Sequence, residues 1–241
     1  MTKTMDLSII IPAYNEEKKI QTDIIEAIKF LKKASLKGEI IVSTDGITDK
    51  TNEIVEKMQM NFKNVILLAE KKKIGKGAAI KKGVKISTGN IIMFVDAGLC
   101  VPYENAKKGI DLINVGYDCA MGSRAEKGSK ILKKQPLYRF IGSKVFKFMI
   151  HSLLQIPSQI KDTQCGFKLY KNNVAKDIYS KLKTTKMMFD IEVILRMKKK
   201  KYKVASFPVT WKNDEDTKFD PMKGTLDNFH DLFLIKIKHK L

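Results

Sequence analysis

The stretch Asn90–Leu99, NIIMFVDAGL, predicts the centre of an α/β sheet. Its five consecutive apolar residues, bounded by Gly89 and Gly98, are typical of a short strand that is covered on both faces. Asp96 follows the last of them, and open α/β sheets bind their ligands at the carboxyl ends of such strands. An acid in this position can also simply cap the next turn. Asp96 is therefore a candidate site residue whose role depends on which other loops end beside it.

The chain of 241 residues is long enough to bury the core of one large α/β domain, and 44% of its residues are hydrophobic. Its three cysteines, Cys100, Cys119 and Cys165, are odd in number and lack the spacing of metal ligands, so we expect reduced thiols in a cytoplasmic protein. No signal-peptide pattern opens the sequence, and no apolar run approaches the roughly 18 residues of a membrane span. We expect a protein that is soluble or bound to a membrane surface.

A net charge of +20 raises nucleic acids and anionic membranes as partners. Only three of the 46 basic residues are arginines, however, which indicates a general preference for lysine rather than selection for phosphate binding. The lysine runs 71–73 and 198–201 have only Tyr202 beside them, whereas nucleic-acid surfaces interleave basic and stacking aromatic residues. We therefore expect no nucleic-acid partner, and each arginine should stand where its planar, two-pronged geometry is needed.

The first half of the chain alternates strands and helices. Strands are predicted over 7–11, 39–43, 65–69 and 91–95, with helices over about 20–31, 49–58 and 78–86 between them. Three crossovers in a row predict a mostly parallel sheet with helices on both faces. The rest of the chain is expected to contain helices over 103–115, 135–156, 172–182, 189–197 and 225–241, and strands over 119–122, within 160–170 and over the edge segment 203–211. The final residues, 235–241, also alternate like a strand.

The loops after the first, second and fourth strands bring polar residues to one edge of this sheet. Tyr14 and Glu16 follow the first strand, Asp45 follows the second and Asp96 the fourth, so we expect these side chains in a single crevice that suits a nucleotide. The glycines of the loop 75–77 follow the third strand rather than the first, so they are not a dinucleotide fingerprint. They can equally be ordinary glycines at a helix start.

The helix predicted over 135–156 has one polar, mostly basic face, on which Arg139, Ser143, Lys147 and His151 recur every four residues. An amphipathic helix of this kind can lie at a membrane interface or roof the domain. The spacing favours a helix that packs over the domain.

Short motifs are spread over nearly the whole chain: Pro12–Glu17, Asp45–Gly46, Gly75–Gly77, Asp96–Ala97, Gly122–Arg124, Asp162–Lys168 and Phe189–Glu192. Together they resemble the family 2 glycosyltransferases with the GT-A (Rossmann-like) fold, and within them the dolichyl-phosphate glucosyltransferases and dolichyl-phosphate mannose synthases. The resemblance implies a single glycosyltransferase domain over 1–241. Residues 1–122 would form its nucleotide-sugar half, and 123–241 its acceptor half with amphipathic helices.

The resemblance also implies roles for individual residues. The nucleotide would lie against Pro12, Ala13, Tyr14, Glu16, Asp45, Lys76, Gly77, Asp96 and Ala97. Arg124, Arg139 and Ser143 would bind the acceptor phosphate, and Asp162 and Asp96 would be the catalytic acids. The implied reaction is the inverting transfer of a hexose, glucose from UDP-glucose, to a polyprenyl or dolichyl phosphate, with Mg²⁺ or Mn²⁺ held at Asp96. A phosphate monoester is already largely ionised, its second pKa being about 6, so Asp162 would orient this nucleophile more than deprotonate it.

The chain departs from the family pattern in its acids. The metal-binding Asp-X-Asp pattern reads Asp-Ala-Gly over 96–98, Thr44 replaces an acid, and Ile74 replaces an arginine. One acid and a diphosphate make a weak site for a divalent ion. Three outcomes are open: Lys76 and its neighbours carry part of the charge, Glu192 or water completes the metal shell, or the chain is an inactive relative that binds nucleotide sugars or glycans.

No apolar run is long enough for the transmembrane anchor that these relatives usually carry. Peripheral attachment through helix 135–156 and the basic C-terminus, on the cytoplasmic face of a membrane, is the expected substitute, since each lysine near an anionic surface contributes about 1 kcal/mol. A soluble acceptor is the alternative.

Overall fold

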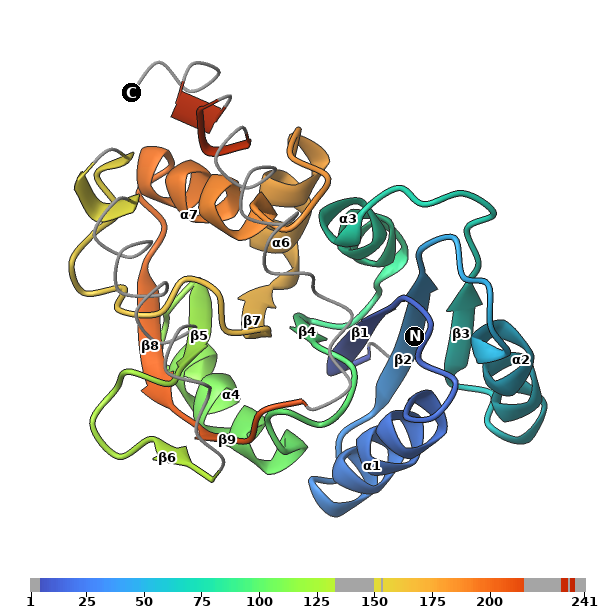
Figure 1. Ribbon diagram of the computed structural model, residues 1–241. Coiled ribbons are helices and arrows are strands. Elements are labelled where there is room, and N and C mark those ends of the chain that lie inside the picture. Colours follow the sequence, from blue (N-terminus) through green and yellow to red (C-terminus); the bar gives the residue numbers. More distant parts are fainter. Residues whose placement is uncertain (1–4, 133–149, 153, 215–230, 234, 237–241) are drawn as a thin grey trace.

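A seven-stranded sheet, with the strand order β3-β2-β1-β4-β7-β5-β8, forms the centre of the molecule (Figure 1). The computed structural model describes residues 5–132, 150–152, 154–214, 231–233 and 235–236. The first four strands are β1 (Leu7–Ala13), β2 (Gly38–Thr44), β3 (Val65–Leu68) and β4 (Ile91–Val95), and they pair in parallel. The mostly parallel α/β sheet predicted from the sequence is confirmed.

The second half of the chain completes the same sheet. β5 (Cys119–Ser123) pairs in parallel with β8 (Val204–Pro208), and β7 (Phe167–Lys171) lies antiparallel between β4 and β5. Because β7 runs in the opposite direction, its amino end lies where the parallel strands have their carboxyl ends. The residues just before β7 therefore join the loops that follow β1, β2, β4 and β5.

The edge strand predicted over 203–211 divides in two. β8 forms the edge of the main sheet, whereas β9 (Thr210–Trp211) pairs with β6 (Lys130–Ile131) in a separate two-stranded sheet. Pro208 ends β8 because it has no N–H to donate to a strand ladder. The carbonyl of the next residue, Val209, accepts a hydrogen bond at 3.0 Å from the first residue of β6. The sequence did not predict this small second sheet.

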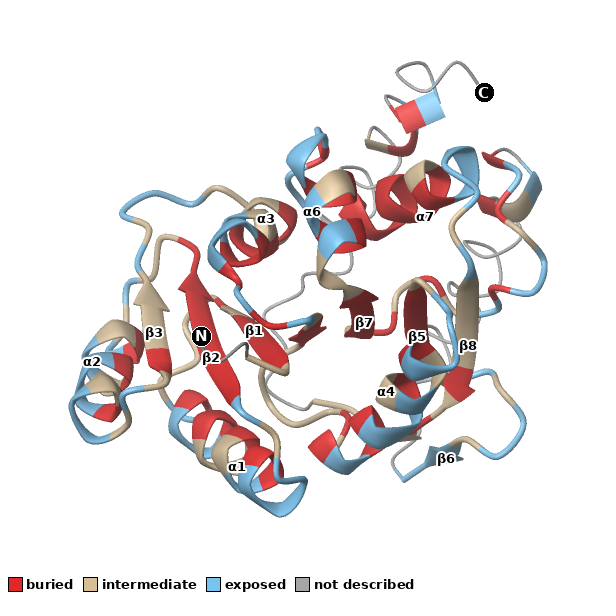
Figure 2. Cartoon of the chain, turned by 180° about the vertical axis from the view of Figure 1, so that it is seen from behind, coloured by how far each residue is buried: buried red, intermediate tan, exposed pale blue. Residues whose placement is uncertain are grey.

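Helices cover both faces of the sheet, and each face has its own apolar core (Figure 2). Ile9 and Ile11 of β1 lie in one core and Ile10 in the other. Alternate side chains of a strand point to opposite faces, so a strand covered on both faces is apolar throughout, as predicted for 91–95. One face carries α1 (Ile20–Lys33), α2 (Thr51–Asn61) and α4 (Ala106–Asn114), and the other carries α3 (Lys76–Ile86), α6 (Asn172–Ser180) and α7 (Phe189–Lys199).

Three helices begin differently from the prediction, and the first is α2, which starts at Thr51 rather than at about 49. α3 starts at Lys76 rather than 78, directly after Gly75, which has a φ of 95°. A Cβ on Gly75 would lie 2.5 Å from the Thr185 carbonyl oxygen, so both the conformation and the close approach require glycine. The helix predicted over 103–115 begins as a 3-10 turn, Tyr103–Asn105, and continues as α4.

The helices predicted over 135–156 and 225–241 lie largely outside the described residues. In their described parts, Ile150, Leu154, Leu232 and Ile235 are buried in the core shared with α3, α6 and α7. All three cysteines are free thiols, as predicted. Across the described ranges, no helix has both the length and the apolar character needed to cross a membrane.

Candidate functional site

Asp45 ties together the loops at the carboxyl edge of the sheet. This acid follows β2 and is buried, and its backbone N–H donates to the carbonyl of Ala13, at the end of β1, at 3.0 Å. Its Oδ1 accepts hydrogen bonds from the backbone N–H groups of Ile74 at 2.5 Å and Gly75 at 2.9 Å. Asp45 thereby fixes the loop that leads into α3, and the loops converge as predicted.

The loop after β1 runs against the start of α2. Pro12–Ala13 forms the end of β1 itself, paired with β2, and the backbone N–H of Glu16 donates to Oγ1 of Thr51 at 2.9 Å. The ammonium group of Lys73 lies 3.8 Å from the centre of the Tyr14 ring. This contact places an aromatic ring and a cation side by side at the edge predicted to bind the nucleotide.

An ion pair between Lys76 and Asp96 occupies the centre of this edge. Nζ of Lys76, at the start of α3, lies 2.6 Å from Oδ1 of Asp96, which follows β4. Burial opposes the charge of Lys76, but the carboxylates of Asp96 and Asp190 outweigh burial and raise the pKa of Lys76. The backbone N–H of Asp96 donates to the Gly166 carbonyl at 2.9 Å, and the Asp96 carboxylate lies so close to Gly166 that no Cβ fits between them.

Two further predicted nucleotide positions, Gly77 and Ala97, are packing positions as well. A Cβ on Gly77 would lie 2.6 Å from Cβ of Phe189, so glycine lets α3 approach α7 closely. Ala97 packs against the core on the α1 face.

Gly98, where the resemblance implies a second acid, is held by an acid from α1. Its backbone N–H donates to both carboxylate oxygens of Asp23, at 2.9 and 3.1 Å, and its φ is 92°. Asp23 is 1% exposed, and burial raises its pKa to about 7. Sequence reasoning missed this acid. The available signal was an acid on the apolar face of α1, beside Ile20 and Ile24.

Arg124 and Asp162 form a forked ion pair at the same edge of the sheet. Nε and one terminal nitrogen of Arg124 lie 2.7 and 2.9 Å from the two oxygens of Asp162, and the Arg124 backbone N–H donates at 3.0 Å. Burial alone would raise the pKa of Asp162, but Arg124 outweighs burial and lowers it. The guanidinium also lies over the Trp211 ring, 5.4 Å from its centre. Arg139 and Ser143, the other predicted acceptor residues, lie outside the described residues.

A third ion pair, Lys168 with Asp190, is buried and was also missed. Lys168, on β7, is fully buried. Its Nζ lies 2.5 Å from Oδ1 of Asp190 and donates to the Thr163 carbonyl at 3.1 Å. Burial raises the pKa of Asp190, although Lys168 and then Lys76 oppose the rise. A buried lysine is tolerated only when its charge is paired in this way.

The described residues do not fit a divalent ion held by the protein alone. They contain no group of three or more His, Cys, Asp or Glu side chains arranged around one point. Asp96 is already paired with Lys76, and a glycine, Gly98, stands at the position where a second acid is expected. Glu192, considered as a further ligand, instead accepts from the backbone N–H of Thr184 at 2.6 Å and from Arg196 at 2.8 Å, so that hypothesis was wrong.

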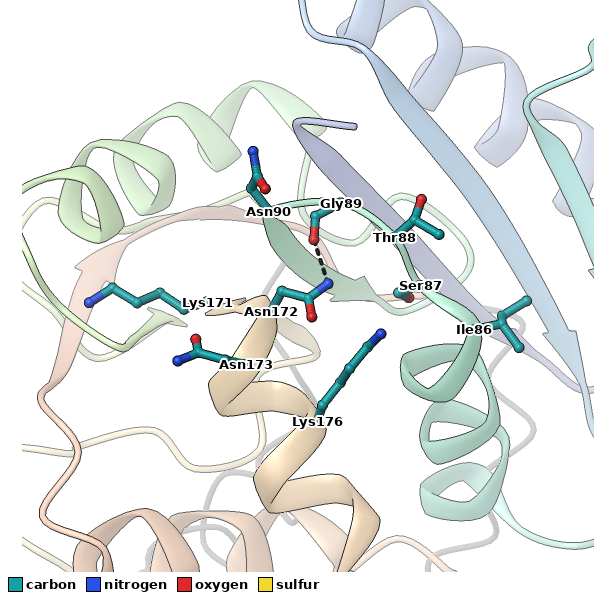
Figure 3. Close-up of a pocket in the computed structure, with 9 residues that line it drawn as sticks. All are labelled: Ile86, Ser87, Thr88, Gly89, Asn90, Lys171, Asn172, Asn173 and Lys176. Carbon is teal, nitrogen blue, oxygen red and sulfur yellow. Dashed lines mark hydrogen bonds between the residues drawn. The ribbon is translucent and has the colours of Figure 1, made fainter. Parts of the chain in front are cut away.

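A hollow of about 620 Å³ lies at the opposite edge of the sheet, around the start of β4 (Figure 3). In it, Nδ2 of Asn172 donates to the Gly89 carbonyl at 2.6 Å. Lys171, which also lines the hollow, pairs with Asp118 at 2.9 Å. The hollow contains none of the predicted site residues and lies apart from the site. Its lining comprises Ile86, Ser87, Thr88, Gly89, Asn90, Lys171, Asn172, Asn173 and Lys176.

The sequence matches a family model described as Glycosyl transferase family 2 over residues 8–179. A dolichyl-phosphate beta-glucosyltransferase of Dictyostelium discoideum is 30% identical, over 98% of this chain and 75% of its own length. The protein of the same name from Homo sapiens is 29% identical, over 98% of this chain and 76% of its own length.

Solved structures share the fold at low sequence identity. Mycobacterium tuberculosis glucosyl-3-phosphoglycerate synthase superposes with a TM-score of 0.71 at 14% identity, covering 98% of this chain and 80% of its own. The same synthase in complex with Mn²⁺, UDP and phosphoglyceric acid gives a TM-score of 0.68 at 15% identity, covering 98% and 78%. At such identities the similarity concerns the fold.

Proposed function

Because the chain belongs to glycosyl transferase family 2, we propose that it transfers glucose from UDP-glucose to the phosphate of a polyprenyl lipid, with inversion of the anomeric centre. The fold is the GT-A fold, and the chain is a hexosyltransferase. The choice of glucose and of a lipid phosphate follows the names of its relatives, the dolichyl-phosphate beta-glucosyltransferases. Those names also disfavour the inactive, glycan-binding alternative.

The observation that carries the proposal is the presence of two cations at one edge of the sheet. Lys76 lies on the side where the donor nucleotide was predicted, and Arg124 lies on the side of the acceptor. A transfer between a nucleoside diphosphate and a phosphate monoester brings two anions together, and each needs a positive group beside it.

On the donor side, we assign the base and ribose to the loops after β1 and β2. Tyr14, Glu16 and Asp45 lie in these loops, and Pro12 and Ala13 form the end of β1 before them. The diphosphate would lie near Lys76, Gly77, Asp96 and Ala97. The Lys73–Tyr14 contact and the fixed loop at Asp45 support this assignment, since both stabilise the conformation of the edge before a ligand arrives.

On the acceptor side, the pKa of Asp162 argues for an orienting role. Arg124 lowers that pKa, so Asp162 is ionised at neutral pH and is a weak base. The acceptor phosphate needs no strong base, because it is itself largely ionised near neutral pH. We therefore propose that Asp162 holds the guanidinium of Arg124 toward the acceptor phosphate, and that Arg139 and Ser143 contribute further contacts.

In the proposed reaction, an oxygen of the acceptor phosphate attacks the anomeric carbon of the sugar. The new carbon–oxygen bond forms on the face opposite to the diphosphate, whose own bond to that carbon breaks, so the configuration inverts. UDP leaves with the electron pair of the broken bond. Lys76 and Arg124 would align the two anions, and this positioning lowers the activation barrier of the transfer. The resemblance implies Mg²⁺ or Mn²⁺ at Asp96, but the described residues supply no group of three ligands for such an ion there.

We also propose peripheral attachment to the cytoplasmic face of a membrane. The support is the net charge of +20, since lysines near an anionic surface each contribute about 1 kcal/mol. A lipid acceptor would then be reached from the surface of the bilayer.

A transfer assay tests the proposed function. Radiolabelled UDP-glucose and GDP-mannose are each offered with dolichyl phosphate, undecaprenyl phosphate or 3-phosphoglycerate in detergent. We expect glucosylated lipid phosphate in which the sugar configuration is inverted. Arg124→Lys should lower the rate at least about tenfold, since the forked geometry is lost. Arg196→Lys is the matched control, because Arg196 is paired with Glu192 of its own helix and not with Asp162.

Two results would contradict the proposal. Transfer to 3-phosphoglycerate but to neither lipid would establish a soluble acceptor. UDP binding without transfer to any acceptor would establish a binding protein.

A further inference from the structure

Two lysines lie beside residues 96–98, where the family's metal pattern predicts a divalent ion. Lys76 contacts Asp96, and Lys19 lies next to Gly98. We propose that Lys76, rather than a bound divalent ion, balances the charge of the donor diphosphate, so that the nucleotide binds without added metal. The inference rests on the proposed function, because it concerns the donor site of that reaction. It follows from the backbone at Gly98, from the groups that surround it and from the way Lys76 is held.

The backbone at Gly98 is built for glycine and not for an acid. Its φ of 92° lies in the left-handed region, and the next residue, Leu99, is also left-handed at 49°. Two hydrogen bonds from the Gly98 N–H to Asp23 hold this conformation from below. An aspartate at position 98 would be strained, so the second acid is absent together with the backbone geometry that would present it.

The space beside Gly98 is already filled by an ion pair. A Cβ at this position would lie 3.3 Å from Oδ2 of Asp214 and 3.4 Å from Cδ of Lys19. Nζ of Lys19 lies 2.8 Å from both Asp214 and Glu16. Lys19 therefore pairs with two of the acids beside the loop, and Lys76 pairs with Asp96.

Lys76 is held from both sides in a position that suits a phosphate. Asp45 fixes the two residues before it, and the N–H of Ala78, two residues after it, donates to the Thr185 carbonyl at 3.1 Å. Its ammonium group stands at the amino end of α3, where the helix dipole adds to the positive potential. A lysine there binds phosphate as a point charge, the role that the metal has when two acids hold it.

Calorimetric titration with UDP, and with GDP for comparison, tests the inference. Each titration of the full chain is run with excess chelator and again with Mn²⁺. We expect one nucleotide to bind with dissociation constants that differ less than about threefold between the two conditions. Lys76→Met should weaken binding in chelator roughly 10- to 100-fold, as expected for loss of a charged hydrogen bond, and Lys76→Arg should retain most of the affinity.

Lys85→Met provides the matched control, since Lys85 lies exposed in the last turn of the same helix and should leave binding unchanged. Thermal unfolding of each variant shows whether it is folded. Gly98→Asp is the second test: we expect no tightening of UDP binding by Mn²⁺ in this variant.

The possible results separate the two proposals. Binding that requires Mn²⁺ in the natural chain, binding in chelator that survives Lys76→Met, or Mn²⁺-dependent tightening in Gly98→Asp would overturn the inference and leave the proposed function standing. Binding of neither nucleotide in either condition would overturn the proposed function, and the inference with it.

Discussion

Asp23, the acid beneath the Gly98 loop, should make the stability of the protein depend on pH. It is 1% exposed and accepts two hydrogen bonds from the Gly98 N–H, yet burial raises its pKa from 3.8 to about 7. The unfolded chain releases this proton near 3.8, whereas the folded chain keeps it until about 7. The folded state therefore binds more protons between these two pH values. The contribution of Asp23 to the free energy of unfolding is fully present below pH 3.8, and it is lost as the pH rises from there through about 7.

The size of the effect follows from the two pKa values. Between about pH 5.5 and about pH 8, the contribution of Asp23 to the free energy of unfolding should fall by about 2 kcal/mol. Asp23→Asn keeps the shape and an acceptor oxygen but cannot ionise, so its free energy of unfolding should fall less over the same interval. Asp111→Asn, at an exposed acid of α4, is the control and should follow the natural chain.

Urea denaturation followed by circular dichroism at the two pH values measures this difference. The natural chain and Asp111→Asn should each lose about 2 kcal/mol more than Asp23→Asn. If all three proteins lose stability in parallel, Asp23 does not titrate in this interval, and the argument from its burial is wrong.

Three other substitutions test the remaining groups. Lys168→Met leaves Asp190 buried without its cation and should lower the free energy of unfolding by about 3–5 kcal/mol in urea denaturation; an unchanged midpoint would contradict the buried pair. Gly166→Ala puts a methyl group into the Asp96 carboxylate and should slow transfer at least about tenfold while Tm falls little; unchanged kinetics would show that Asp96 need not stay in place. Asp162→Asn should slow transfer about 10- to 100-fold in the radiolabel assay and leave calorimetric UDP binding unchanged, whereas equal losses in both would place Asp162 on the donor side.

The first four strands could be predicted because each contains a short apolar run, and the runs of the first, second and fourth are followed by Pro12, Asp45 and Asp96. Their alternation with helices then dictates parallel pairing. β7 is different, because its sequence contains Lys168, which is completely buried. That burial depends on Asp190, which lies 22 residues further along the chain. Local pattern could indicate a strand there, but not its place between β4 and β5.

In the candidate site, too, the sequence predicts where residues lie but not which residues they pair with. Strand ends correctly located Asp45 and Asp96 at one edge, since parallel strands share that edge. The pairing of Arg124 with Asp162 joins residues 38 apart, and no local rule selects one acid among many at that distance. Gly98 is the clearest case. From the sequence alone it is a position that lacks the expected acid, whereas its φ and its hydrogen bond to Asp23 show that the loop conformation requires glycine.

The segment Asp162–Lys168 explains how the two sides of the site are kept in register. Its first residue holds Arg124, and the carbonyl of Gly166 accepts the N–H of Asp96. Its last residue donates to the Thr163 carbonyl, which closes the segment on itself, and is anchored by a buried ion pair. Because the acceptor-side cation and the donor-side acid are attached to the same closed segment, their separation is determined by this segment. This accounts for a motif of seven consecutive residues in which only Asp162 was expected to have a chemical role.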